Sequence, residues 1–333
     1  MKAFILDRYG AKLPLRLGEV PDPAIGDHDV LVQVHAAAVN LLDSKIRSGE
    51  FKLILPYRLP VVMGHDVAGV VLRVGKDVTQ FKAGDEVYAR PADHRIGTFA
   101  ELIAIHERDV APKPRSLTME QAASIPLVGL TAWQALVERG QLKSGEKVFI
   151  QAGSGGVGTF AIQLAKYLGA SVATTTSAGN MEMVRGLGAD VLVDYQKEDF
   201  EEKLQGYDLV LHSQDAKTLD KSLRVLRSGG QLVSISGPPD PAFADQLGAP
   251  WYLKLVLWLL SFGTRRKAAS LNTVFSFLFM RANGAQLRQL GELIDGGRIR
   301  AVVDKVFPFA EVNQALAYVE SGRAKGKVVI KVR

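Results

Sequence analysis

The chain of 333 residues contains no cysteine, which excludes disulfide bonds, thiolate zinc sites and a catalytic thiol. It also has no run of like charges and no basic helix, and its formal charge of +6 is modest for this length. Binding of nucleic acid is therefore not indicated, whereas a small ligand that carries phosphate fits the mild positive balance. The N-terminus has charged residues where a signal peptide has a long apolar core, so we expect a cytoplasmic protein.

Length and composition indicate two globular domains, since hydrophobic residues make up 47% and charged residues 23% of the chain. Short strand patterns separated by turns dominate residues 1–115 and predict an all-β module. From Lys147 onward strands alternate with helices, which indicates βαβ units and a doubly wound parallel sheet with both faces covered. The last helix and strand are expected to return to the first module. The predicted domains are residues 1–121, completed by about 276–333, and residues 122–275.

A glycine-rich turn follows the strand expected at 147–151 and opens a helix. Gly153, Gly155 and Gly158 have the G-x-G-x-x-G spacing. Without Cβ atoms the turn can close and the backbone can approach a pyrophosphate, toward which the helix N-terminus points its N–H groups. The alternative is a tight turn without a ligand, but the surrounding βα units favour a dinucleotide. The predicted cofactor-binding residues of this turn are Gly153, Ser154, Gly155, Gly156, Val157 and Gly158.

The next strand decides which dinucleotide is expected. An NAD site needs Asp or Glu about twenty residues after the glycines, to bind the ribose 2′-hydroxyl. Residues 170–181 contain no carboxylate, and the small hydroxyl side chains of Thr176 and Ser177 leave room for a 2′-phosphate. Tyr195 and Lys197, after the third strand, could lie alongside that phosphate. We therefore predict NADP(H) as the cofactor.

Segments along nearly the whole chain resemble one family. They include "MGHDVAGVV", "GDEVYA", "IPLVGLTAWQAL", "AGSGGVG" and "VESGRAKGKVVIKV". The chain is similar to zinc-independent medium-chain dehydrogenases/reductases of the quinone oxidoreductase and alkenal/enone reductase type. This resemblance implies a GroES-like β domain fused to a Rossmann domain, an active site in the cleft between them, and a homodimer. It also implies NADPH-dependent reduction of a small apolar carbonyl compound or quinone.

The motif Gly64-His65-Asp66 raises the question of a metal. In zinc-bearing relatives a cysteine, the histidine of a Gly-His-Glu motif and a second cysteine hold the catalytic ion, but here the cysteine positions fall at Asn40 and near Leu127. His65 and Asp66 alone cannot complete a tetrahedral site. We expect no metal ligand in this chain and a hydrogen-bonding role for His65.

Without a metal, hydride would add to the β-carbon of an enone or to a quinone ring, and donors must stabilise the charge that develops on oxygen. The resemblance implies that Asn40 lies beside the nicotinamide and that Lys45, where relatives carry tyrosine or histidine, supplies a proton or contacts the ribose. Thr131 resembles a residue near the nicotinamide ribose. Ser236 and Gly237 follow the fifth strand, where ligands bind in this type of sheet, and are expected to line the nicotinamide.

Two other functions remain open at this point. An enoyl-thioester reductase shares the fold and would need a longer pocket with basic residues for a pantetheine phosphate. A non-catalytic NADPH-binding or redox-sensing protein would bind the cofactor and reduce no acceptor. A zinc alcohol dehydrogenase is disfavoured because the chain has no cysteine.

The segment "WYLKLVLWLLSFGTRRK" (251–267) is the least similar to the family. Residues 251–263 carry one charge, Lys254, and three basic residues follow. This run is shorter than the roughly 20 apolar residues that span a bilayer. A helix that is apolar on all sides is usually buried, so a lid over an apolar channel or a dimer contact is favoured over attachment to a membrane surface.

Overall fold

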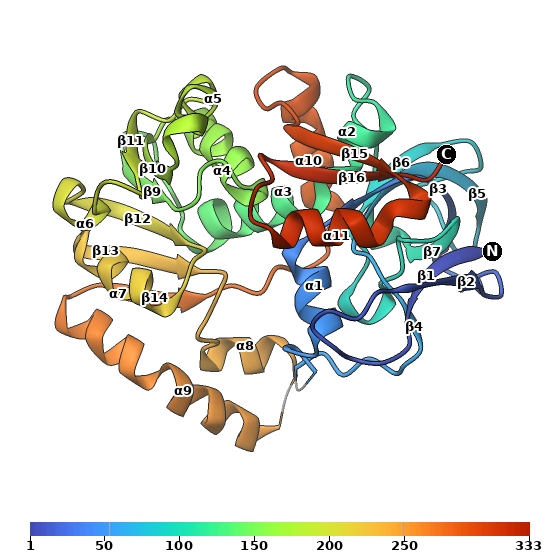
Figure 1. The fold of residues 1–333 in the computed structure, drawn as a ribbon, viewed down its shortest axis with the longest axis horizontal. Helices are drawn as coiled ribbons and strands as arrows, with labels where there is room; N and C mark the ends of the chain where they lie inside the picture. The colour runs from blue at the N-terminus through green and yellow to red at the C-terminus, as the bar shows by residue number, and fades with distance from the viewer. Residues whose placement is uncertain (53, 249) are drawn as a thin grey trace. The chain divides into compact units, whose positions relative to one another are not determined.

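The computed structural model describes residues 1–52, 54–248 and 250–333, and the chain divides into two compact units (Figure 1). The first comprises Met1–Leu130 and Arg281–Arg333, and the second Thr131–Met280. The sequence predicts these boundaries at 121/122 and about 275/276, which lie nine and about five residues earlier.

The first unit is built on two sheets. Within its described residues the larger sheet has seven strands in the order β15-β16-β3-β5-β6-β8, with β7 also paired to β3. The smaller has the order β2-β1-β4. The strands of the larger sheet are β3 (Asp29–Val39), β5 (Asp66–Val74), β6 (Glu86–Ala89), β7 (Leu102–His106), β8 (Val110–Pro112), β15 (Val303–Pro308) and β16 (Lys327–Lys331). Those of the smaller are β1 (Lys2–Leu6), β2 (Arg16–Glu19) and β4 (Val61–Val62).

Strand β16 lies antiparallel to β3, with Val328 opposite Val39, so the C-terminal strand is part of the same sheet as the N-terminal strands. Strand β3 is almost continuously apolar because nearly all of it is buried. The core of this unit takes buried side chains from β1, β3, β5, β16 and the helix α11. The helices of the unit are α1 (Leu41–Ser48), α2 (Met119–Ala123), α10 (Gly284–Asp295) and α11 (Val312–Glu320); α3 (Pro126–Trp133) crosses the boundary and continues as a π-helix over Gln134–Arg139.

The second unit is a parallel sheet with helices between its strands. In its described part the order of the six strands is β11-β10-β9-β12-β13-β14. They are β9 (Lys147–Ile150), β10 (Ser171–Thr176), β11 (Val191–Asp194), β12 (Tyr207–His212), β13 (Leu226–Ser234) and β14 (Val274–Phe277). The helices are α4 (Gly156–Tyr167), α5 (Met181–Gly186), α6 (Phe200–Lys203), α7 (Ala216–Arg224), α8 (Pro241–Gln246) and α9 (Trp251–Ser270).

The strand order reverses at β9, since β10 and β11 extend to one side and β12 to β14 to the other. Open parallel sheets bind ligands outside the carboxyl ends of their strands at such a reversal. The glycine turn lies at this position because it directly follows β9. The predicted fold class, a GroES-like β domain with a doubly wound Rossmann domain, is confirmed.

Helix α9 differs from the expectation for residues 251–267. Its buried side chains are Leu257, Ser261 and Ala268, while most of its large apolar side chains are exposed. The expectation that a helix with apolar residues on all sides is buried is therefore wrong for α9 in the single chain. None of the described helices is long and apolar enough to cross a membrane.

Candidate functional site

The glycine turn brings β9, β10 and α4 into close contact. A Cβ at position 153 would lie 2.3 Å from Oγ1 of Thr174, and one at position 158 would lie 2.2 Å from the carbonyl oxygen of Ala152. Neither position tolerates a larger residue without a shift of its neighbours. A Cβ at position 155, the N-cap of α4, would have no neighbour nearer than 3.3 Å. Packing therefore requires glycine less strictly here than at positions 153 and 158.

The helix after the turn begins with the predicted residues Gly156, Val157 and Gly158, which are its first three positions. The N–H groups of a helix's first turn have no partner within the helix and carry partial positive charge. Ser154 and Gly155 precede them and are half-buried. The arrangement is suited to bind an anion such as a pyrophosphate.

The carboxyl end of β10 holds the residues predicted to bind a 2′-phosphate. Thr176 is the last residue of β10 and pairs with Asp194, the last residue of β11. The exposed Tyr195 directly follows Asp194. Oγ1 of Thr176 is buried and has no hydrogen-bond partner among the described residues. Ser177 accepts a hydrogen bond from Nδ2 of Asn180 at 3.1 Å. The predicted polar groups thus follow the ends of two adjacent strands.

Ser236 and Gly237 follow β13, and His212 ends the neighbouring strand β12. Nε2 of His212 lies 3.1 Å from the carbonyl oxygen of Asp215, and Nδ1 lies 3.0 Å from the hydroxyl oxygen of Ser234 and 3.3 Å from that of Ser236. Burial lowers the pKa of His212 to about 4, because the charged imidazolium is desolvated there. Thr131 is buried in α3.

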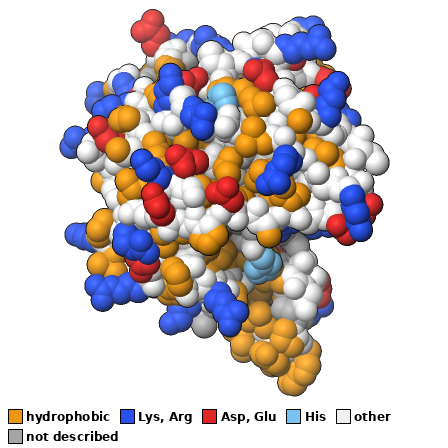
Figure 2. Space-filling view, turned by 90° about the vertical axis from the view of Figure 1, so that its right-hand side faces the viewer, with side chains coloured by type: hydrophobic (Ala, Val, Ile, Leu, Met, Phe, Trp, Pro, Cys, Tyr) orange, Lys and Arg blue, Asp and Glu red, His pale blue; other side chains and the backbone are white. Residues whose placement is uncertain are grey.

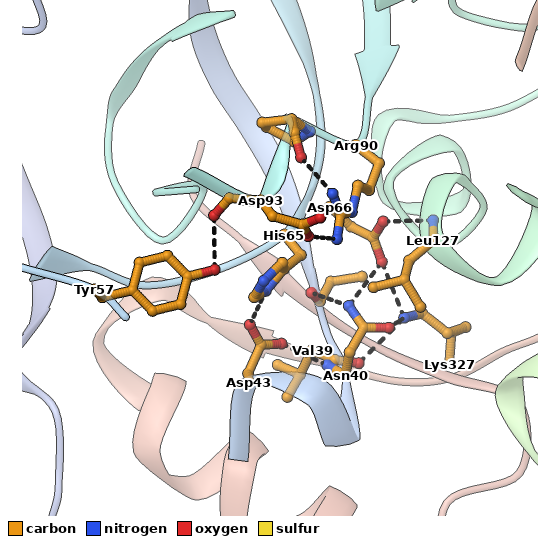
Figure 3. A network of polar contacts seen from close by, with 12 residues as sticks. Val39, Asn40, Asp43, Tyr57, His65, Asp66, Arg90, Asp93, Leu127 and Lys327 are labelled. Carbon is orange, nitrogen blue, oxygen red and sulfur yellow. Dashed lines mark hydrogen bonds and ion pairs between the residues drawn. The ribbon is translucent and has the colours of Figure 1, made fainter. Parts of the chain in front are cut away.

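In the first unit, Lys327 is the centre of a buried polar network (Figure 3). Its ammonium nitrogen lies 2.5 Å from Oδ1 of Asn40, 3.1 Å from Oδ2 of Asp66 and 3.2 Å from the carbonyl oxygen of Val39. Each of the three ammonium hydrogens therefore has an acceptor. Sequence analysis missed this lysine; the signal was a basic residue directly before the apolar run Val328–Ile330 of β16.

Asn40 and Asp66 complete the network. Nδ2 of Asn40 donates to Oδ2 of Asp66 at 2.9 Å, and the backbone N–H of Leu127 donates to Oδ1 at 2.7 Å. The amide of Asn40 is held with its oxygen toward the ammonium group and its nitrogen toward the carboxylate. Its environment is therefore set by a buried ion pair.

His65 and Asp43 form a second buried pair next to Asn40 (Figure 3). Oδ1 of Asp43 lies 2.6 Å from Nδ1 of His65, and its Oδ2 accepts from the backbone N–H of Asn40 at 2.7 Å. Nε2 of His65 is buried and has no hydrogen-bond partner within the described part of the chain. The carboxylate orients the ring, as in other carboxylate–histidine pairs, and leaves Nε2 as its available end.

Lys45, the other predicted catalytic residue, lies on α1 outside this network. Its side chain is half-exposed, forms an ion pair with Glu50 at 3.5 Å and lies over the ring of Phe51. The hydroxyl of Tyr57 donates to the carbonyl oxygen of Asp93 at 2.7 Å. Burial, with a smaller contribution from Asp93, raises the pKa of Tyr57, so this phenol holds its proton.

The residues at the zinc-ligand positions do not fit a catalytic zinc ion. Asn40 already contacts the ammonium group of Lys327, Leu127 has an apolar side chain, and His65 alone of the three positions offers a ligand atom. No group of three or more histidine, aspartate or glutamate side chains suited to a metal occurs among residues 1–52, 54–248 and 250–333.

Comparison with known proteins agrees with this architecture. The alcohol dehydrogenase GroES-like domain family matches residues 26–115, and the zinc-binding dehydrogenase family matches residues 187–330. A mitochondrial NAD(P)H oxidoreductase of Mus musculus is 36% identical over 357 residues, covering 100% of this chain and 89% of that protein. The chain belongs to the quinone oxidoreductase-like medium-chain dehydrogenases/reductases. It is therefore an oxidoreductase.

Two further relatives extend the comparison. The chloroplastic NADPH-dependent alkenal/one oxidoreductase of Arabidopsis thaliana is 36% identical over 341 residues, which cover 99% of this chain and 79% of that protein. The structure of a quinone oxidoreductase from Coxiella burnetii superposes with a TM-score of 0.88 at 31% identity, covering 100% of this chain and 99% of that one. The family resemblance seen in the sequence is confirmed.

Substitution of Lys327 by methionine tests the buried ion pair. Lys327→Met removes the ammonium group and leaves the carboxylate of Asp66 buried with its two remaining donors, so we expect a loss of about 3–5 kcal/mol in the free energy of unfolding. Lys325→Met, at an exposed position two residues earlier, should change it by less than about 0.5 kcal/mol. Urea unfolding measures both. Equal stability of the two variants would contradict a structural role for the network.

The lowered pKa of His212 predicts a pH-dependent stability. Between about pH 4 and its ordinary pKa near 6.5, His212 binds a proton in the unfolded chain but not in the folded one. Stability should therefore fall as the pH drops through this range, by about 3 kcal/mol from this residue. Unfolding of His212→Asn across the same range should lack this component, whereas His94→Asn, at an exposed histidine, should keep it. Parallel profiles for the wild type and His212→Asn would refute the assignment.

Proposed function

We propose that this oxidoreductase reduces α,β-unsaturated carbonyl compounds or quinones with NADPH and without a metal ion. The observation that carries the proposal is the glycine turn at the start of α4, at the reversal of strand order in a parallel sheet. The relatives support the substrate class, since one is named an NADPH-dependent alkenal/one oxidoreductase and another a quinone oxidoreductase.

The preference for NADPH rests on the ends of β10 and β11. No carboxylate occurs in residues 170–181 to bind a free ribose 2′-hydroxyl. Thr176 has a buried hydroxyl oxygen without a partner among the described residues, and Ser177 and Tyr195 lie at the ends of adjacent strands. Lys197 adds an exposed positive charge on the same loop as Tyr195. In this proposal Thr131, Ser236 and Gly237 contact the nicotinamide end, as the family resemblance implies.

Bound NADPH supplies the hydride that adds to the β-carbon of the enone or to the quinone ring. The chain must then stabilise negative charge on the substrate oxygen and deliver a proton. Lys327 and Asp66 form a buried ion pair that holds the amide of Asn40 as a fixed dipole, and preorganised dipoles in a buried site can stabilise developing charge. Asn40 is positioned by Lys327 and Asp66.

His65 is the better candidate for the proton step. Asp43 holds Nδ1 and thereby directs Nε2 away from the pair, and imidazole is the side chain that most often transfers protons in catalysis. A buried nitrogen without a partner costs about 1–3 kcal/mol, which a substrate hydrogen bond would offset. Lys45 is half-exposed, and its ammonium group lies at Glu50 outside the buried network of Asn40.

The loss of reduced-nicotinamide absorbance tests the activity. With chelator-treated protein and either a short enone or a benzoquinone, we expect turnover with NADPH, much less with NADH, and no effect of the chelator. Activity that is lost on chelation and restored by zinc would contradict the metal-free reaction. NADPH binding without turnover of either acceptor would favour an enoyl-thioester reductase or a non-catalytic NADPH-binding protein instead.

A pair of variants tests which residue supplies the proton. His65→Gln keeps a polar side chain but cannot carry a proton, and we expect kcat to fall on the order of a hundredfold while KM for NADPH stays unchanged. Lys45→Met should leave kcat within a few fold. Solvent isotope effects on kcat for both variants provide a readout that a purely structural role of His65 would not change. The opposite ranking of the two variants would assign proton supply to Lys45.

A further inference from the structure

Helix α9 presents an inverted pattern of apolar residues. Its buried side, which packs against the rest of the second unit, contains Leu257, Ser261 and Ala268, of which two are small. Ser261 is used internally, since its hydroxyl donates to the carbonyl oxygen of Leu257 at 2.8 Å. The large apolar side chains therefore project from the other sides of the helix.

Eight of the eighteen large hydrophobic side chains that are exposed among the described residues belong to this one helix, so the exposure is concentrated and not scattered. Their exposed fractions lie between 40% and 77%. They are Trp251, Tyr252, Leu255, Val256, Trp258, Leu259, Leu260 and Phe262. α9 is the lowest element in Figure 1, and the orange side chains that project at the bottom of Figure 2 correspond to it. A contiguous patch of this kind marks an interaction surface.

The charge on α9 is of one sign. The helix contains no aspartate or glutamate and carries Lys254, Arg265, Arg266 and Lys267. Two of these are neutralised, since Lys254 pairs with Asp245 at 2.8 Å and Lys267 with Asp220 at 2.5 Å.

The two arginines of α9 differ from these lysines. Arg265 lies over the ring of Trp258, 5.5 Å from its centre, and Arg266 is exposed. Neither has a carboxylate partner in the part of the chain that the structure describes. The apolar patch is thus flanked by the exposed guanidinium group of Arg266, which is available to an anionic partner, and by that of Arg265, which also donates to the carbonyl oxygen of Trp258 at 3.3 Å and to the hydroxyl of Ser261 at 3.2 Å.

We propose that α9 docks on an anionic lipid surface. In this arrangement the aromatic and aliphatic side chains enter the boundary between headgroups and acyl chains, and Arg265 and Arg266 bind lipid phosphates. Trp251, Tyr252 and Trp258 suit this depth because their rings are apolar with one polar edge. The helix lies on the surface and does not span the bilayer.

A second copy of the chain fits this surface less well. A two-fold symmetric contact would bring α9 against the same face of its copy, which again contains no carboxylate. The arginines would then approach a surface of like charge, whereas lipid phosphates neutralise them. The proposal does not depend on which substrate the oxidoreductase reduces.

Flotation of the full chain with lipid vesicles tests the proposal. We expect binding to vesicles of phosphatidylcholine and phosphatidylserine in equal parts, weak binding to phosphatidylcholine alone, and weaker binding in high salt. The double variant Leu255→Ser/Leu259→Ser should bind at least about tenfold more weakly, and Arg266→Glu on the order of tenfold more weakly. Leu17→Ser/Leu72→Ser, at exposed leucines of the first unit, is the matched control and should bind like the wild type.

The fluorescence of the tryptophans and the oligomeric state complete the test. Insertion should shift the emission of the wild type to shorter wavelength with anionic vesicles, and Trp251→Phe/Trp258→Phe should lack most of this shift. No flotation of the wild type, or equal flotation of the Leu255→Ser/Leu259→Ser variant, would overturn the proposal. Sedimentation that shows an oligomer dissociated by Leu255→Ser/Leu259→Ser, without vesicle binding, would assign the surface to a second copy.

Discussion

The buried ammonium group of Lys327 is the interaction on which the first unit depends. Burying a charge costs several kcal/mol unless its hydrogens find acceptors, and here they bind Val39, Asn40 and Asp66. These residues come from the end of β3, the start of α1 and the start of β5, while the lysine begins β16. The same contacts therefore hold the C-terminal strand in the sheet and orient the amide of Asn40.

This network also explains how a fold shared with zinc-binding dehydrogenases can place other groups at the metal positions. A positive charge still lies behind the residue at the first ligand position, but a lysine supplies it and a carboxylate balances it. His65 has a carboxylate partner at Nδ1, and its Nε2 has no partner among the described residues. In the proposed reaction, charge stabilisation and proton transfer are separate tasks of separate side chains, which suits acceptors that conjugation already activates.

Helix α9 obeys a different constraint. An apolar helix is normally stabilised by burying its large side chains, but α9 buries one leucine and two small residues and exposes most of its aromatic and aliphatic side chains. The helix is stabilised by its local propensity and by one narrow stripe of buried residues. Burial of its outer face would release further free energy, and in the proposal above this comes from docking on a lipid surface. This is the only part of the described structure in which so many large apolar side chains are exposed together.

The sequence by itself determined the fold class and the position of the glycine turn, because strand–helix alternation and glycine spacing are local patterns. It also shows the absence of cysteine and predicts Asn40 as a site residue. Only the tertiary structure decided that Lys327 neutralises Asp66, that Asp43 orients His65 and that Lys45 pairs with Glu50. The first two pairs join residues far apart in the chain, so no local pattern reveals them. The direction in which the side chain of Lys45 points, toward Glu50, is not specified by the sequence either. The orientation of α9 was likewise decided by the tertiary structure. A helix that is apolar on all sides has no sequence pattern that selects the face to be buried.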